Sequence, residues 1–317
     1  MAEKNSACGF KTSIGGQALM EGILMRGPKM QAIVCRGEDG LIEKTEELKF
    51  VRDKYPILGK PLIRGVVTFL DSLIKGMSAL MYSASLIPED QQGEPDKLDL
   101  WIEKHFSAEK AKDIIIAVSA VLGVALALFL FIFLPTFLVG LIKPLHDRYV
   151  LRNLTEGACK IIILIIYMFL CSKEKDVARV FMYHGAEHKT IFCYEHGRDL
   201  TVENVRTESR FHPRCGTSFL LVVVIVSILV NSVVVTSNTA LRMLFHLLLL
   251  PVVVGISYEI NRWCGLHDNA LSHVLSAPGK WLQRITTAEP EDGMIECAIR
   301  ALQLVIPEEK GADEWGR

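Results

Sequence analysis

The run Ile114–Ile142, IIIAVSAVLGVALALFLFIFLPTFLVGLI, contains no charged residue. A helix needs roughly 20 consecutive apolar residues to cross the hydrocarbon core of a bilayer, and this run is longer. Pro135 lies towards its far end, where we expect a kink because proline cannot donate the i→i−4 hydrogen bond of a helix. The run therefore predicts a membrane-spanning helix and decides the fold class.

Three further apolar runs lie downstream: Ile161–Cys171, Phe219–Val235 and Met243–Tyr258. The first of these is long enough to span only if its helix begins near Leu154 and Lys160 extends its ammonium group to the interface. The second contains Asn231, and the third is followed directly by Glu259. We therefore predict an α-helical polytopic membrane protein with about four spanning helices and a small strand-containing cytoplasmic part at the N-terminus.

The composition supports this fold class. Of the 317 residues, 50% are hydrophobic, and the mean hydropathy of +0.30 is high for a soluble protein. The formal net charge of −1 gives no basis for nucleic-acid binding. The eight cysteines are scattered without a C-x-x-C pair, which favours free thiols on a reducing cytoplasmic side. The polar start MAEKN lacks the apolar segment of a secretory signal peptide, so we expect none.

Positive charge near the spans predicts their orientation. The segment 172–217, between Ile161–Cys171 and Phe219–Val235, is rich in lysine and arginine, whereas the link from Val235 to Met243 carries only Arg242. Lysines also precede the first run. We therefore expect both termini and segment 172–217 in the cytoplasm, although the basic link 143–160 does not fit this orientation.

We divide the chain into four parts. Residues 1–62 form a strand-rich segment, in which Gly37-Glu-Asp-Gly40 is typical of a hairpin turn. Residues 63–113 contain an amphipathic helix at 63–87, which packs on a core or lies in the membrane interface, and a polar linker at 88–98. Residues 114–260 form the transmembrane bundle, and 261–317 form a cytoplasmic tail with an amphipathic helix from Met294 to Val305.

The chemistry-bearing stretch is Tyr183–Ile191, YHGAEHKTI. His184 and His188 stand four residues apart, so a helix places both imidazoles on one face. Glu187 completes the order H-x-x-E-H, which is that of the inverzincin metal motif. Imidazoles that share a face can hold a divalent metal, and a neighbouring carboxylate can accept a proton from metal-bound water.

This motif indicates a membrane-associated metallohydrolase of the peptidase or esterase type. His184 and His188 would hold Zn²⁺ or another divalent metal, with Glu259 as the third ligand and Glu187 as general base. The expected partners are the lipid bilayer and an unknown protein or peptide substrate. A simpler interpretation of Glu259 is that it pairs with Arg262, three residues further on.

The sequel Phe211–Thr217, FHPRCGT, adds His212 and Cys215. In the hydrolase these side chains would support the metal site or contact the substrate. In an alternative, a non-catalytic membrane scaffold, His184, His188, His212 and Cys215 would make a closed structural zinc site. A weaker idea is thiol catalysis by Cys215 with His212 as base. A transport function also has little support, because His246 and Asn231 are the only residues in the apolar runs that could line a proton or ion route.

The glycine-rich stretch Gly15–Pro28 is neither a P-loop nor a dinucleotide-binding fingerprint. The residues favour a small antiparallel sheet here, over a second interpretation in which Glu21 and Arg26 reach a site elsewhere.

Several stretches together resemble one family. They are Gly15–Gly22, Met25–Pro28, Tyr183–Thr190, Leu200–Val205, His212–Thr217 and Ile256–Glu259. In these stretches the chain is similar to the YqhQ-like family of uncharacterised bacterial membrane proteins, and the similarity covers nearly the whole chain. That family has a domain of unknown function and is catalogued at most as a predicted metal-dependent enzyme. The resemblance implies a multi-pass protein of the bacterial inner membrane, but no reaction or substrate.

Overall fold

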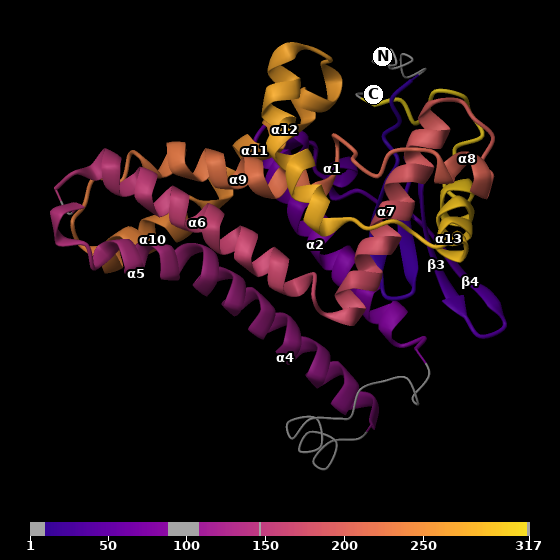
Figure 1. Cartoon of the computed structure of the whole chain (residues 1–317), viewed down its shortest axis with the longest axis horizontal. Coiled ribbons are helices and arrows are strands. Elements are labelled where there is room, and N and C mark those ends of the chain that lie inside the picture. Colours follow the sequence, from indigo (N-terminus) through magenta and orange to yellow (C-terminus); the bar gives the residue numbers. More distant parts are fainter. Residues whose placement is uncertain (1–9, 88–107, 146, 316–317) are drawn as a thin grey trace. The chain divides into compact units, whose positions relative to one another are not determined.

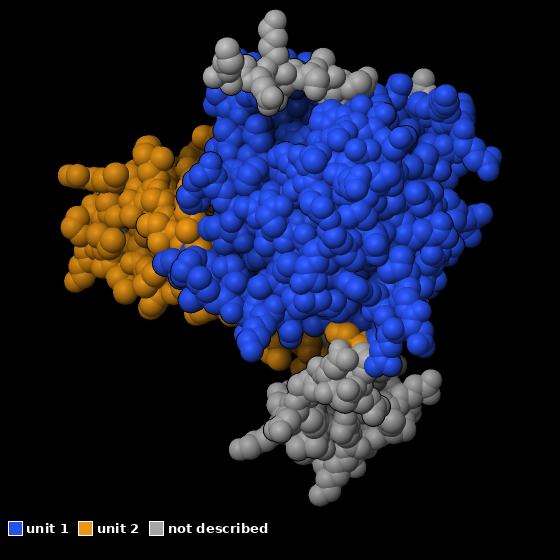
Figure 2. Space-filling view, turned by 45° about the vertical axis from the view of Figure 1, so that its right-hand side comes forward, with its two compact units in different colours: residues 1–86, 166–223, 252–317 blue, residues 87–165, 224–251 orange. Residues whose placement is uncertain are grey.

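The computed structural model describes residues 10–87, 108–145 and 147–315 (Figure 1). The predicted linker at 88–98 lies outside the described residues. The chain divides into two compact units, which Figure 2 shows in different colours. The first unit comprises residues 1–86, 166–223 and 252–317, and the second comprises residues 87–165 and 224–251.

The first unit contains a four-stranded antiparallel sheet in the order β1-β2-β3-β4. Its strands are β1 (Gly15–Leu19), β2 (Gly22–Arg26), β3 (Met30–Gly37) and β4 (Gly40–Glu47). The pair Gly37 and Gly40 closes the β3–β4 hairpin around a two-residue loop, and Gly40 has a φ of +134°, which a residue with a side chain rarely adopts. The hairpin predicted at this turn is therefore present.

Helices cover both faces of this sheet. On one face, Ile23, Met25 and Val34 pack with the helices α7 (Lys175–Glu195) and α13 (Asp292–Gln303). On the other face, Leu19, Leu24 and Ile33 pack against Ala79 of the helix α2 (Ile63–Ala84). Because β2 is buried on both faces, its sequence does not alternate between apolar and polar residues. The N-terminal strands therefore fold against the helix that carries the histidine motif.

Helix α2 matches the amphipathic helix predicted at 63–87. Its buried residues are small: Gly65, Gly76, Ala79 and Ser83. Its large apolar side chains, Leu70, Leu73 and Ile74 among them, are exposed on the opposite side. An exposed apolar stripe of this kind is typical of a helix in a membrane interface.

The remaining helices of the first unit are short or lie in the C-terminal part. They are α1 (Val51–Lys54), the 3₁₀ turn Pro56–Gly59, α8 (Val202–Arg206) and α12 (Ala270–Thr286). The structure places the predicted C-terminal amphipathic helix, now α13, in the centre of the core, where Met294, Ile295 and Leu302 are fully buried. Sequence reasoning did not identify α12, which contains Pro278.

The second unit is helical in its described part. It contains α4 (Ala108–Leu128), a π-helical turn (Phe129–Phe133), α5 (Leu134–Gly140), the 3₁₀ turn Lys143–Leu145, most of α6 (Tyr149–Cys171), part of α9 (Gly216–Asn231), α10 (Thr239–Leu248) and the start of α11 (Leu250–Leu266). The irregularity that accompanies Pro135 is the π-helical turn that precedes it, which accommodates the missing proline N–H.

Among the described residues, two helices are long and apolar enough to cross a membrane: Ala117–Gly140 and Tyr149–Cys171. In the first, only 6% of the most apolar window is buried, which is compatible with insertion into a membrane. Helices α10 and α11 would make a third span as a pair bent by 47°. Pro251 lies at the start of α11 and accounts for the break. Helix α9 is shorter than a span, so the structure supports two to three candidate spans where the sequence predicted four.

Candidate metal centre

Helix α7 carries His184 and His188, whose ring centroids are 4.3 Å apart. Cys215 directly precedes α9 and completes the group, with 3.1 Å between its Sγ and His184 Nε2. One ligand atom from each of the three side chains lies within 4.8 Å of the other two. In the described part of the chain, no other group of three His, Cys, Asp or Glu side chains meets this spacing.

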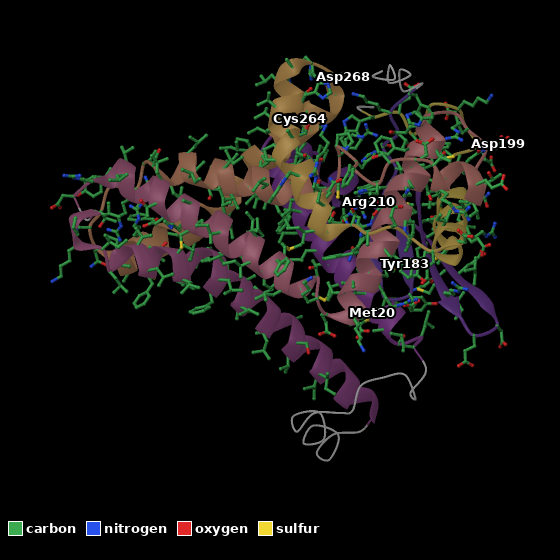
Figure 3. The ribbon with its side chains drawn as sticks, in the orientation of Figure 1. Met20, Tyr183, Asp199, Arg210, Cys264 and Asp268 are labelled. Carbon is green, nitrogen blue, oxygen red and sulfur yellow. The ribbon has the colours of Figure 1, made fainter. Side chains whose placement is uncertain are left out.

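Two backbone carbonyls orient the imidazoles. His184 Nδ1 lies 2.8 Å from the carbonyl oxygen of Thr286, and His188 Nδ1 lies 2.5 Å from that of Arg210, which is labelled in Figure 3. A carbonyl oxygen can only accept, so each Nδ1 is the donor, and in the neutral ring Nε2 carries the lone pair. Metal-binding histidines in proteins are usually held in this way.

Gly185 allows the approach of the segment that holds His184. A Cβ atom at this position would lie 2.0 Å from the carbonyl oxygen of Ala288. The amide of Ala288 also donates a hydrogen bond of 2.8 Å to the Phe181 carbonyl of α7. Gly185 thus lets residues 286–288 lie against α7. As a result, the Thr286 carbonyl reaches His184.

The sulfur of Cys215 has the electrostatics of a thiolate. Burial alone would raise the pKa of this thiol, but the imidazoles of His184 and His188 outweigh burial and hold the pKa well below its usual value. Burial likewise opposes the charged form of His184, yet the Cys215 sulfur raises the pKa of His184 to about 9. The amide of Thr217 also donates to the sulfur at 3.4 Å. A thiolate is the form in which cysteine binds a metal or attacks a substrate.

Glu187 lies on α7 between the two histidines and is almost completely buried. Its Oε1 accepts a hydrogen bond of 2.9 Å from the backbone N–H of Gly16 in β1. Burial raises the pKa of the Glu187 carboxyl, and the imidazoles of His188 and His184 oppose this shift. A carboxyl with a raised pKa next to a possible metal site has the properties of a general base.

His212 does not join the group formed by His184, His188 and Cys215. Its Nε2 is 3.7 Å from Glu195, and the Gln283 side chain binds both its backbone N–H and its carbonyl. Arg214 pairs with the same Glu195. Burial lowers the pKa of His212 to about 4. The ring therefore belongs to a separate buried polar network, and the structure pairs Cys215 with His184 instead of His212.

Glu259 is also outside the group. Arg64 of α2 binds both of its carboxylate oxygens, at 2.7 and 2.5 Å. The amide of Leu62 donates a further hydrogen bond to it at 3.3 Å. Glu259 therefore joins α11 to the start of α2, and its partner is Arg64 instead of Arg262. The metal-capable set that the structure brings together is His184, His188 and Cys215, with Glu187 beside it.

The sequence analysis favoured a plain antiparallel sheet for the glycine-rich stretch Gly15–Pro28, and it did not anticipate that Glu21 contacts the motif helix α7. Glu21 forms a two-pronged ion pair with Arg179 of α7, and its second carboxylate oxygen accepts from the Tyr183 hydroxyl at 3.1 Å. Its φ of +47° is unusual for a residue with a side chain, so the structure holds this tight turn in place. The signal in the sequence was a charged residue between the two strands of a glycine-rich hairpin. Arg26, the other residue considered, lies near Ser72 of α2.

The fold and the site together define a mostly helical protein, whose described part has two to three candidate spans, a small antiparallel sheet and a largely buried His–His–Cys group. Residues 60–308 match the family described as protein of unknown function DUF1385, and the chain belongs to this family. It is 35% identical to "Uncharacterized protein YqhQ" of Bacillus subtilis (strain 168) over 294 residues, which cover 92% of each chain. No solved structure matches the chain.

Proposed function

We propose that this protein is a membrane-associated metal-dependent hydrolase whose metal ligands are His184, His188 and Cys215. The observation that carries the proposal is the convergence of these three ligand atoms within 4.8 Å, with both imidazoles oriented through Nδ1 by backbone carbonyls. Two nitrogens and a thiolate sulfur suit zinc. Three protein ligands leave a fourth position for water or substrate, which distinguishes catalytic from structural zinc sites.

A zinc ion in this set would supply a Lewis acid and a water of lowered pKa. Glu187 is the general base of the proposed reaction. Its carboxylate accepts the proton of the attacking water and then delivers it to the leaving amine or alcohol of an amide or ester. Burial raises the pKa of Glu187, which suits a group that must both take and release a proton near neutral pH.

We place this activity at the bacterial inner membrane, with the site on the cytoplasmic side. Two to three apolar helices are compatible with insertion, and the exposed apolar stripe of α2 in the same unit as the site is suited to the interface. A protein or peptide segment near the membrane surface is the substrate class that this placement favours.

The test compares metal content with function in a strain that lacks the chromosomal gene. Glu187→Gln keeps the size of the side chain and removes the base. We expect the purified variant to keep its metal and to fail in complementation, because loss of a general base costs ~10²–10⁴-fold in rate. Glu203→Gln, on the exposed surface of α8, is the control and should complement. Full complementation by Glu187→Gln would refute the catalytic assignment.

A second candidate is thiol catalysis by Cys215 with His184 as base, because 3.1 Å separates the sulfur from His184 Nε2. Metal analysis separates this candidate from the hydrolase: a thiol enzyme would be purified without stoichiometric metal and would be inactivated by iodoacetamide. The structural-zinc scaffold requires a fourth protein ligand. His212 would have to leave Glu195 to provide it, and His212→Ala would then release the metal.

A further inference from the structure

The second unit contains a cluster of buried charged side chains in its candidate spanning helices. Arg152, Glu156 and Lys160 lie on the buried face of α6, at successive turns of the helix. Arg242 and His246 lie on the buried face of α10, one turn apart. The sequence analysis named Lys160, Arg242 and His246 separately without bringing them together, and it missed Arg152 and Glu156 because it began the second apolar run at Ile161. Ionisable groups in apolar helices are costly and usually functional.

Both arginines of the cluster, Arg152 and Arg242, form hydrogen bonds within the protein. Arg152 donates to Glu156, to the carbonyl of Ser237 and to the hydroxyl of Thr239, at 3.2–3.3 Å. Arg242 donates to the same Glu156 at 2.8 Å, to the Val234 carbonyl at 3.0 Å, and to the Asn153 side chain. These bonds fix residues 234–239 against α6. One carboxylate thus serves both guanidinium groups.

Two nitrogens of the cluster remain without a hydrogen-bond acceptor among the described residues. Lys160 is only 6% exposed, and its ammonium group has none. His246 is 4% exposed, and its Nε2 also lacks a partner, at 3.8 Å from Glu156. The hydroxyl of Thr136 lies 3.3 Å from His246 Nδ1 and can either donate or accept there. In the tautomer with the proton on Nε2, both Lys160 and His246 offer an unused donor.

The charges of the cluster do not balance. The two arginines exceed the single carboxylate of Glu156 by one positive charge, and a protonated Lys160 adds a second in the same buried environment. An unpaired buried charge is strongly destabilising, and so is a buried donor without an acceptor. The excess charge and the unused donors occur in the same cluster, beside Glu156.

We propose that this cluster binds a small monovalent inorganic anion, with Lys160 and His246 as its direct ligands and the two arginines as the surrounding positive charge. The burial of both residues favours a small ligand over a phospholipid headgroup. The site lies in the second unit and is independent of the proposed hydrolase.

The test uses the full-length protein in phosphatidylcholine nanodiscs, with sodium chloride replacing sodium gluconate at constant ionic strength. We expect the melting temperature to rise by roughly 2 °C for each tenfold increase in chloride above its Kd, because a ligand of the folded state stabilises it. Lys160→Met should abolish this rise and should melt higher than the wild type in gluconate. Lys143→Met, at an exposed position of the same unit, should keep the full rise.

Binding of radioactive chloride, measured by equilibrium dialysis, keeps the proposal testable if one variant does not fold. The wild type should bind chloride saturably, and His246→Asn should weaken the binding at least tenfold. Equal melting in chloride and gluconate would overturn the proposal, as would an undiminished chloride response in Lys160→Met. Stabilisation by added phosphatidylglycerol without any chloride response would also overturn it and would assign the cluster to a lipid phosphate.

Discussion

The backbone N–H of Gly16 donates a hydrogen bond of 2.9 Å to Glu187, which lies 171 residues further along the chain. A Cβ atom on Gly16 would lie 3.0 Å from the Glu187 carboxyl carbon and 2.7 Å from the Leu24 carbonyl oxygen. The glycine therefore lets β1 approach the helix that carries the proposed base, and one oxygen of that base is held in a fixed direction.

Gly16→Ala should displace Glu187 without removing a metal ligand. We expect a loss of stability of about 1–3 kcal/mol, because the added methyl group meets backbone and side-chain atoms that are already packed. Metal content should remain near that of the wild type while complementation falls. Gly15→Ala is the matched control, since a Cβ there has no neighbour within 4 Å. Equal behaviour of the two variants would contradict the positioning of Glu187 by Gly16.

Cys215→Ser should reduce the metal content of the purified protein, because a neutral hydroxyl is a much poorer zinc ligand than a thiolate. The measurement is elemental analysis after dialysis against a weak chelator. Cys264→Ser is the control, at a partly exposed free thiol outside the proposed ligand set. Full metal retention by Cys215→Ser would remove this cysteine from the ligand set.

Glu259→Gln should leave the metal content unchanged, because Arg64 occupies both carboxylate oxygens of Glu259. We expect a loss of stability of about 1 kcal/mol or less, since the ion pair is partly exposed. Arg64→Gln should have a similar effect on the melting temperature. A loss of metal in Glu259→Gln alone would restore Glu259 as the third ligand.

The ion pair between Glu21 and Arg179 predicts a pH dependence of stability. The Arg179 guanidinium lowers the pKa of the Glu21 carboxyl below its unfolded value. The pair therefore stabilises the fold above the unfolded pKa of about 4.3, and this contribution is lost as pH falls through the lower folded pKa. Glu21→Gln should reduce stability near pH 7 by at most about 1 kcal/mol, because the carboxylate is partly exposed.

The check for the Glu21 prediction is a denaturation series between pH 7 and pH 3. The difference between wild type and Glu21→Gln should shrink as the pH falls. A difference that stays constant over this range would mean that the charge of Glu21 does not contribute.

The orientation predicted from the basic residues places the C-terminus in the cytoplasm. A C-terminal green fluorescent protein fusion should therefore fluoresce, and a C-terminal alkaline phosphatase fusion should be inactive. The reverse result would place the proposed metal centre outside the cytoplasm, because the described C-terminal residues and α7 belong to the same compact unit.

The features that depend on local pattern could be predicted from the amino-acid sequence. Long uncharged runs gave the helical class, because a spanning helix must satisfy its own backbone and be apolar along its length. The spacing of His184 and His188 placed both imidazoles on one helix face, because a helix repeats every 3.6 residues. The turn Gly37–Gly40 was also readable, since it requires only neighbouring residues.

Contacts between side chains that are distant in the sequence became visible only in the folded chain. Nothing in the local pattern distinguishes Cys215 from His212 or Glu259 as a partner of the two histidines, because all three can bind a metal. The packing of α7 against residues 286–288 and against the start of α9 brings Cys215 to His184, while Glu195 holds His212 and Arg64 holds Glu259. Partners of this kind follow from three-dimensional packing, which a helical or strand repeat does not encode.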